Sequence, residues 1–207
     1  MSSGSGYSDA VRDAHQIHCG LYELARAVAL SVGLGLALIV APIASAQPEN
    51  PLVPLVDAAA QRLQVAEPIA ATKLLDGGLI QDPAREQQVL DAVAAAATER
   101  NIDRAYVTNI FRDQIDATVA IEYSRLSQWK LDPASAPLTA PDLSSSRAAI
   151  DGLNWTMVTE MADEWQELHS PMCLADLDAA KNLVAQARAM DPLYRQAVDF
   201  VTRNYCR

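Results

Sequence analysis

Four basic residues in this chain lie where helical periodicity turns side chains toward the protein interior. They are Arg62, Lys73, Arg85 and Arg147. A protein core normally excludes such groups, because burying an unpaired charge is energetically costly. Thr118 and Glu122, four residues apart, share the inward face of another predicted helix. Several cations directed toward one cavity indicate a pocket for a small polyanion.

The spacing of the first two cations supports a shared pocket. Arg62 and Lys73 are eleven residues apart, which is within about 20° of three full helical turns. Both are therefore predicted to project from one side of one helix. The simpler alternative is that an inward arginine extends its charged end to solvent or pairs with a carboxylate, and Glu122 could be that partner.

The other two cations occupy different predicted helices. Arg85 lies in the first turn after Asp82, near free backbone N–H groups and the positive end of the helix dipole. Arg147 shares a helical face with apolar residues and with Asn154. Each position taken singly is weak support for a site, whereas the four cations together indicate one.

The elements that must position these groups are all helical. Glycines at 77–78 end the first helix, and Asp82-Pro83 begins the second, because Asp caps helices and Pro suits the first turn. No segment alternates with period two, so the prediction is an all-α single domain. The predicted helices cover residues 52–75, 82–100, 103–130, 142–169, 174–190 and 192–205.

Composition narrows the function classes. The chain has 207 residues, is 50% hydrophobic, and carries a net charge of −10. An acidic chain of this kind is not expected to bind nucleic acid, because such proteins normally present a basic stripe. No CxxC, HExxH, GxGxxG or GxxxxGK[ST] pattern is present, so the sequence signals no metal, dinucleotide or P-loop nucleotide site.

The N-terminal part resembles an export signal. Two arginines precede an apolar stretch from Ala27 to Ile43, and Ala44-Ser45-Ala46 fits the small-x-small cleavage pattern. We predict a signal peptide over residues 1–46, with cleavage between Ala46 and Gln47. The mature domain would cover residues 47–207, be secreted or periplasmic, and be free of the membrane. The alternative is an uncleaved anchor, because the apolar stretch is only slightly shorter than a membrane span.

Cleavage would remove Cys19 and leave Cys173 and Cys206. Two cysteines in an exported protein, one of them next to the C-terminus, predict a disulfide. Two unpaired buried thiols are the alternative.

The order of these residues resembles the helical, all-α chorismate mutases. The resemblance rests on Arg62, on Lys73 eleven residues later, on the segment 82–86 (Asp-Pro-Ala-Arg-Glu), and on the Thr118–Glu122 pair. The exported subclass is the most similar, and the segments that carry this likeness are residues 57–63, 121–125, 129–137 and 142–147. The resemblance extends from about Leu55 to Cys206 and includes the cysteine pair.

The resemblance implies the conversion of chorismate to prephenate. This is an intramolecular [3,3] rearrangement, so it requires no nucleophile, metal or cofactor. The enzyme must fix a compact substrate conformer and stabilise the charge that develops on the breaking ether oxygen.

The resemblance also implies a role for each cation. Arg62, Arg85 and Arg147 would hold the two substrate carboxylates, for which guanidinium groups are well suited. Lys73 would contact one carboxylate and the ether oxygen. Glu122 would donate a hydrogen bond to that oxygen, so it must be protonated, and activity is expected to fall at alkaline pH.

Other residues are implied to complete the substrate site. Glu86, with the backbone of Asp82, would bind the ring hydroxyl, and Thr118 would line the carboxylate end. Gln88 would also contact substrate, although a shift of one residue in this helix would place Val89 there instead.

Two other functions stay open on the sequence alone. Isochorismate–pyruvate lyases resemble the same helical family and use a similar cationic pocket. A non-catalytic exported helical binding protein, with structural cations, is the other alternative.

The resemblance also implies how the chain assembles. In the exported mutases the site is built within one protomer, whereas intracellular members take one arginine from a partner chain. Arg147 would have the role of that arginine here, and a homodimer is expected.

Overall fold

The computed structural model describes residues 50–207. The predicted signal peptide and its cleavage site therefore lie outside the described residues. Within this range the chain is helical and contains no strand, as predicted. None of these helices combines the length and hydropathy needed to cross a membrane. The helices are α1 (Val53–Gln64), α2 (Ala66–Asp76), α3 (Pro83–Glu99), α4 (Arg104–Leu131), α5 (Leu143–Asp163), α6 (Cys173–Ala187) and α7 (Pro192–Thr202), with short 3-10 turns η1 (Pro133–Ser135) and η2 (Glu167–His169).

Aspartate side chains begin four of these helices. Asp82, Asp103, Asp142 and Asp191 each accept a hydrogen bond from a backbone N–H group in the first turn that follows. Those N–H groups have no partner within the helix, so the caps satisfy donors that would otherwise be free. The sequence predicted the first of these caps correctly, and with it the position of Arg85.

The first predicted helix is divided in two at Val65. This residue keeps helical dihedral angles, with φ −70° and ψ −16°, and joins α1 to α2. Pro68 explains the division, because proline has no N–H group and its ring crowds the carbonyl four residues earlier, at Gln64. Arg62 and Lys73 therefore project from two successive helices, not from one as predicted.

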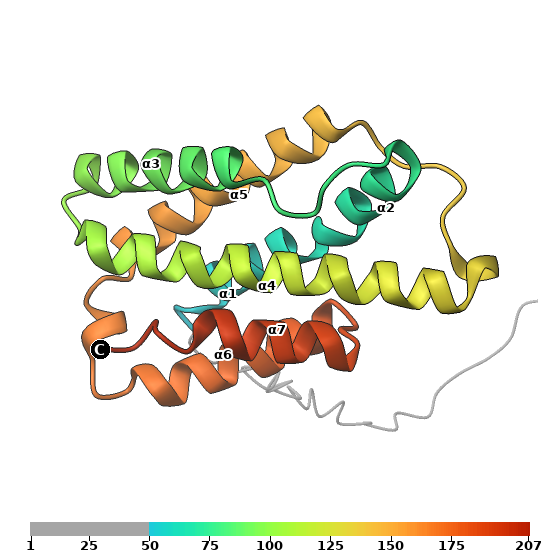
Figure 1. Cartoon of the computed structure of the whole chain (residues 1–207). Coiled ribbons are helices and arrows are strands. Elements are labelled where there is room, and N and C mark those ends of the chain that lie inside the picture. The colour runs from blue at the N-terminus through green and yellow to red at the C-terminus, as the bar shows by residue number, and fades with distance from the viewer. Residues whose placement is uncertain (1–49) are drawn as a thin grey trace, which may run out of the picture. The chain divides into compact units, whose positions relative to one another are not determined.

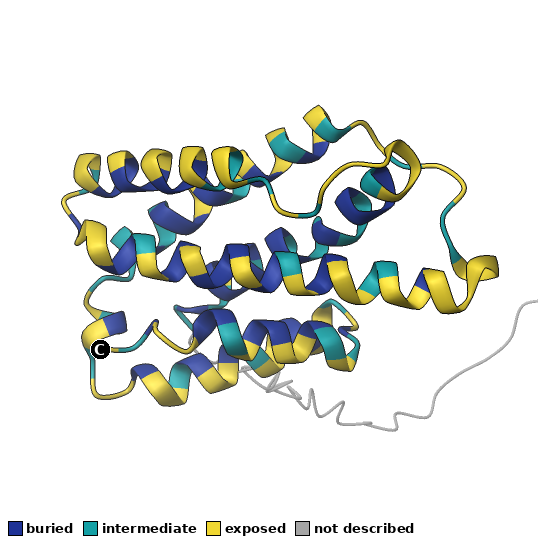
Figure 2. Ribbon diagram, in the orientation of Figure 1, coloured by how far each residue is buried: buried dark blue, intermediate teal, exposed yellow. Residues whose placement is uncertain are grey.

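The longest helix, α4, forms the centre of the domain. It contacts α2 and α3 on one side and α7 on the other, and α1 packs against α5, α6 and α7 (Figure 1). Buried residues line the faces that the helices turn toward one another, and exposed residues line their outer faces (Figure 2). The fold therefore brings α2, α3, α4 and α5 together around one region of the domain.

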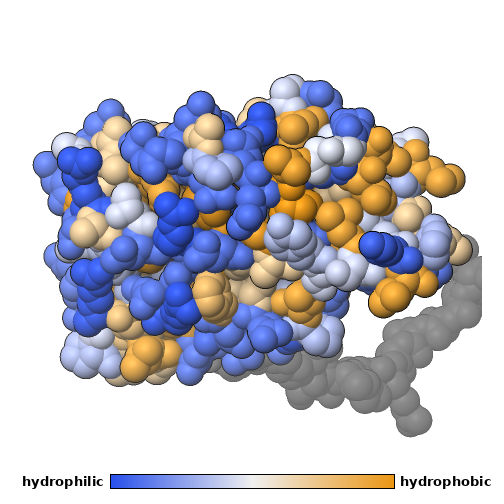
Figure 3. Space-filling view, in the orientation of Figure 1, coloured by the Kyte–Doolittle hydropathy of each residue, from blue (hydrophilic) through white to orange (hydrophobic). Residues whose placement is uncertain are grey.

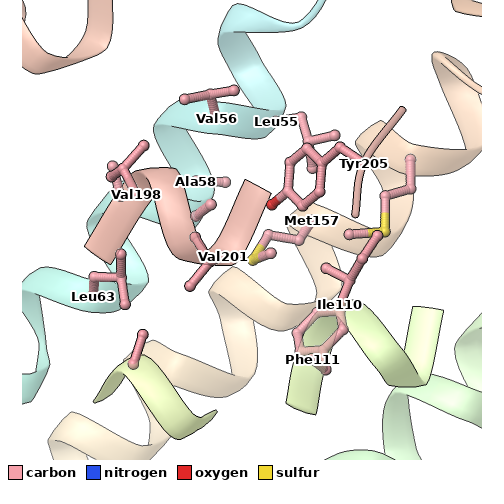
Figure 4. Close-up of a cluster of buried hydrophobic side chains, with 14 of the residues drawn as sticks. Leu55, Val56, Ala58, Leu63, Ile110, Phe111, Met157, Val198, Val201 and Tyr205 are labelled. Atoms are coloured by element: carbon pink, nitrogen blue, oxygen red, sulfur yellow. The ribbon is translucent and has the colours of Figure 1, made fainter. Parts of the chain in front are cut away.

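The core is built from aliphatic and aromatic side chains of α1, α4, α5 and α7. Leu55, Ile110, Phe111 and Met157 are fully buried and converge in Figure 4. Burial of such side chains contributes about 1.5–3 kcal/mol each. Because this packing fixes the separation of α1, α4 and α5, it also fixes the separation of the polar residues that these helices carry.

Hydrophobic side chains also remain on the surface near the end of α2. Leu74, Leu75 and Leu79 are exposed there and in the connection to α3. Hydrophobic surface is concentrated over this half of the molecule in the view of Figure 3, whereas the half that holds the start of α4 is mainly hydrophilic.

The predicted disulfide is present between Cys173 and Cys206. It joins the first residue of α6 to the C-terminal segment, 33 residues later. The neighbouring Tyr205 is fully buried, and its carbonyl oxygen accepts a hydrogen bond of 2.6 Å from the Tyr106 hydroxyl on α4. The disulfide thus ties the C-terminal segment to α6, and the Tyr106 hydrogen bond ties it to the central helix α4.

Removal of this disulfide is expected to destabilise the domain without unfolding it. Closing a loop of this length stabilises a protein by about 3 kcal/mol, mainly by restricting the unfolded chain. We expect a Cys173→Ser/Cys206→Ser variant to melt roughly 6–12 °C below the wild type in calorimetry. A reductant should lower the melting temperature of the wild type to that of the variant and leave the variant unchanged. Equal melting temperatures without reductant would contradict the prediction.

Candidate active site

All four predicted cations line one pocket between α2, α3, α4 and α5, into which Arg62 reaches from α1. Apolar side chains such as Ile115 and Ile150 form its walls, and the charged groups are set among them. The polar residues of the lining are Arg62, Lys73, Asp82, Arg85, Glu86, Thr118, Glu122 and Arg147.

Arg62 is the most deeply buried of the cations, with 2% of its surface exposed. Its Nε donates to Asn154 Oδ1 at 2.7 Å, and its Nη1 donates to Thr118 Oγ1 at 3.2 Å. Nη1 also contacts the Gln114 carbonyl oxygen at 3.3 Å. Burial lowers the pKa of Arg62 to about 10, so the group remains charged at neutral pH.

Lys73 and Glu122 form a buried ion pair. Lys73 Nζ lies 2.7 Å from Glu122 Oε2, and the two side chains are 11% and 4% exposed. The same Nζ donates to the carbonyl oxygen of Ile80 at 2.6 Å. Gly77, with φ 73°, turns the chain after α2 so that the connection to α3 returns over Lys73. The ammonium group is thus fixed between a helix and a loop.

The surroundings of Glu122 favour its protonated form more than water does. Burial raises its pKa above the ordinary value, and the hydrogen bond and charge of Lys73 offset part of that rise. A protonated carboxyl can donate a hydrogen bond, which a carboxylate cannot. Any bound anion would raise the pKa further, because it disfavours the charged form.

Arg85 and Arg147 lie nearer the rim of the pocket and are paired with carboxylates. Arg85 Nη2 lies 2.5 Å from Asp151 Oδ1, and Arg147 Nη2 lies 2.8 Å from Asp82 Oδ2. Asp82 also caps α3 through its other oxygen, which accepts from the Arg85 N–H at 3.1 Å. One side chain therefore fixes both the start of α3 and the position of Arg147.

One sequence prediction about α3 is wrong. Gln88 lies on the exposed face of the helix and does not line the pocket, whereas Val89 is buried and does. Helical periodicity accounts for the difference, because Val89 follows Arg85 and Glu86 by four and three residues and shares their face. Glu86 lines the pocket, and its Oε2 accepts from Arg112 Nη1 at 3.2 Å.

Three polar contacts of the site were not identified from sequence. Periodicity places Asn154 on the same face as Arg147 but does not predict its contact with Arg62, and it predicts no role for Gln114 or Asp151. Gln114 precedes Thr118 by four residues, so the same periodicity that placed Thr118 inward could have found it. Asp151 precedes Asn154 by three residues, but its pairing with Arg85 depends on how α3 and α5 pack.

The charges of the pocket suit a small dianion. Lys73, Arg85 and Arg147 have carboxylate partners, whereas Arg62 is held only by uncharged groups among the described residues. A ligand with two carboxylates could take the place of Asp82 and Asp151 at the rim arginines and add a partner for Arg62. The apolar walls favour a ligand whose remaining surface is largely carbon.

Sequence comparisons identify relatives over nearly the whole domain. The model of the chorismate mutase type II family matches residues 54–123. The secreted chorismate mutase of Mycolicibacterium smegmatis is 58% identical over 172 residues, which is 83% of this chain and 95% of that protein. The secreted chorismate mutase of Mycobacterium tuberculosis is 46% identical over 188 residues, covering 89% of this chain and 94% of that protein.

A solved structure has the same arrangement of helices. The crystal structure of chorismate mutase from Burkholderia phymatum superimposes with a TM-score of 0.72 at 29% sequence identity, over 76% of this chain and 97% of that chain. The helical fold, the cationic pocket and the two secreted relatives agree with one another. The chain belongs to the family of secreted, all-α chorismate mutases.

Proposed function

We propose that this chain converts chorismate to prephenate in the pocket between α2, α3, α4 and α5. The observation that carries the proposal is the convergence of Arg62, Lys73, Arg85, Arg147 and Glu122 on one cavity of one chain. Chorismate has two carboxylates on a carbon framework, which matches the charge and the apolar walls of this cavity. The activity named for the secreted relatives agrees with this chemistry.

Substrate binding would replace protein carboxylates with substrate carboxylates. Arg85 and Arg147 would leave Asp151 and Asp82 to form bidentate contacts with the ligand. Arg62 would bind a carboxylate at the base of the pocket, beside Thr118. Unlike the rim arginines, it would not have to leave a protein carboxylate to do so. Holding both carboxylates fixes the enolpyruvyl arm over the ring, and this orientation is a large part of the catalytic effect.

Stabilisation of the breaking ether bond is assigned to Lys73 and Glu122. The electrons of the ether C–O bond shift onto oxygen as the new carbon–carbon bond forms, so this oxygen becomes more negative in the transition state. The Lys73 ammonium and a protonated Glu122 carboxyl, which lie 2.7 Å apart without ligand, would both donate to it. Donors fixed before the reaction stabilise such charge without reorganisation.

The ring hydroxyl is assigned to the first turn of α3. Glu86 lines the pocket there, and the backbone beside Asp82 offers further polar groups. The Arg112 contact at 3.2 Å fixes the orientation of the Glu86 carboxylate.

The nearest enzymatic alternative is release of pyruvate from isochorismate. The presence of the Thr118–Glu122 pair within the pocket favours the mutase. Purified protein supplied with each compound separately distinguishes the two activities. We expect chorismate to disappear as prephenate forms, and pyruvate release from isochorismate with chorismate untouched would overturn the proposal.

Export and assembly are further parts of the proposal. We expect a signal peptide over residues 1–46, cleavage between Ala46 and Gln47, a secreted or periplasmic product, and a homodimer whose protomers each hold a full site. The names of the secreted relatives support export. The mass of the exported product tests the cleavage site, and sedimentation tests the dimer.

Loss of the Lys73 ammonium is expected to remove most of the turnover and little of the stability. Lys73→Ala deletes one preorganised donor to the ether oxygen, which corresponds to a loss of about 10²–10³ in kcat. Lys130→Ala is the matched control, because Lys130 is exposed on the same helix as Glu122. Steady-state kinetics and melting curves measure both effects. A large fall in melting temperature with unchanged turnover would support the non-catalytic alternative.

Activity is expected to depend on a proton at Glu122. The pKa of this group is raised, so the active protonated form persists to a higher pH than for an ordinary carboxyl and is lost as pH rises through that value. The wild type should therefore lose kcat/KM by about tenfold per pH unit on the alkaline side. Glu122→Gln, whose amide donates at every pH, should lack this decline. An identical alkaline decline in both proteins would show that another group titrates.

A further inference from the structure

The hydrogen-bond partners of Arg62 are unusual for a buried arginine, and the proposed catalytic roles do not explain them. Four oxygen atoms surround this guanidinium: Asn154 Oδ1, Thr118 Oγ1, and the carbonyl and Oε1 atoms of Gln114. All four belong to uncharged groups. A buried arginine usually has a carboxylate partner, because an uncompensated buried charge destabilises the fold.

The helices could place a carboxylate beside Arg62 with little change. Asn154 and Gln114 have the same shapes as aspartate and glutamate, and both side chains already reach the guanidinium. Their surroundings are buried, with 5% of Asn154 and 0% of Gln114 exposed. The absence of a charge at these two positions is therefore not forced by geometry.

Gln114 also carries an unsatisfied donor. Among the described residues, neither its Nε2 nor the buried hydroxyl of Tyr205 has a hydrogen-bond partner at normal geometry. The two groups face each other, and the Gln114 amide offsets part of the rise that burial causes in the pKa of Tyr205, as a donor directed at the Tyr205 oxygen does, but the contact is too poorly formed to satisfy either group. A glutamate would replace this poorly satisfied donor with an acceptor for the Tyr205 hydroxyl. The glutamine is thus the less stabilising of two residues of nearly equal size.

We propose that Gln114 and Asn154 are positioning residues whose neutrality keeps Arg62 available to a substrate carboxylate. Their oxygen atoms fix the guanidinium from two helices, α4 and α5, and leave its full charge for the ligand. A carboxylate at either position would neutralise Arg62 and repel the substrate dianion. The chain therefore gives up stability in the empty site to retain affinity for substrate.

This arrangement distinguishes Arg62 from the rim arginines. Asp82 and Asp151 are partly exposed, so they can turn toward solvent when a ligand arrives. A carboxylate on Gln114 or Asn154 has no such exit, because these positions are enclosed by the packed helices. An ionic partner is compatible with binding at the rim but not at the base of the pocket.

Isosteric charge substitutions test the proposal, which rests on the proposed mutase activity. In Gln114→Glu we expect the melting temperature to rise by about 3 °C or more, because the buried charge gains a partner. We expect KM for chorismate to rise about ten- to a hundredfold, with a smaller change in kcat. Asn154→Asp should shift both quantities in the same directions. A purely structural role would lower stability and activity together.

Asn182→Asp is the matched control. This residue is exposed on α6, and the substitution changes the net charge by the same amount. It should leave KM unchanged. A KM in both site variants within about twofold of the wild type would overturn the proposal, as would lower melting temperatures in both variants. Failure of the mutase assignment would be seen separately, as a wild type that does not consume chorismate.

Discussion

The buried charge of Arg62 is the constraint around which the site is organised. The residue is nearly inaccessible to solvent and has only uncharged hydrogen-bond partners among the described residues. Its position requires α1, α4 and α5 to pack at fixed separations, because its partners lie on the last two of these helices. The aliphatic core supplies this rigidity, together with the C-terminal segment, which the disulfide ties to α6 and the Tyr106–Tyr205 hydrogen bond ties to α4. The interior thus holds one strong positive charge ready for an anion.

The remaining charges of the pocket are graded by depth. At the base, Arg62 has no carboxylate partner within residues 50–207. At mid-depth, Lys73 pairs with Glu122, whose pKa is raised by burial. At the rim, Arg85 and Arg147 pair with aspartates that remain partly exposed. This order allows a dicarboxylate to displace the outer partners and to reach an unpaired cation inside. It also provides two donors near the point at which the ether oxygen would gain charge.

The sequence supported the all-α class, the Asp82 cap that begins α3 and the inward direction of the four cations. Those features depend on local periodicity and on side-chain chemistry, which a single sequence carries. The division of the first helix at Val65 follows from Pro68, because proline weakens helical hydrogen bonding in the preceding turn. The prediction for Gln88 is wrong by one residue in helical phase. Periodicity alone does not fix the rotation of a helix about its axis to within one position. The pairs Arg85–Asp151 and Arg147–Asp82 link residues more than sixty positions apart, so they depend on helix packing that the sequence does not display.

The central claim is that one chain holds a complete site for the rearrangement of chorismate. The most direct measurement is the conversion of chorismate by purified protein that begins at Gln47, followed as substrate loss and prephenate gain in the same sample. The account predicts equal amounts of chorismate lost and prephenate formed, without an added cofactor. Chorismate that remains unchanged with a folded protein, or that disappears without forming prephenate, would contradict it.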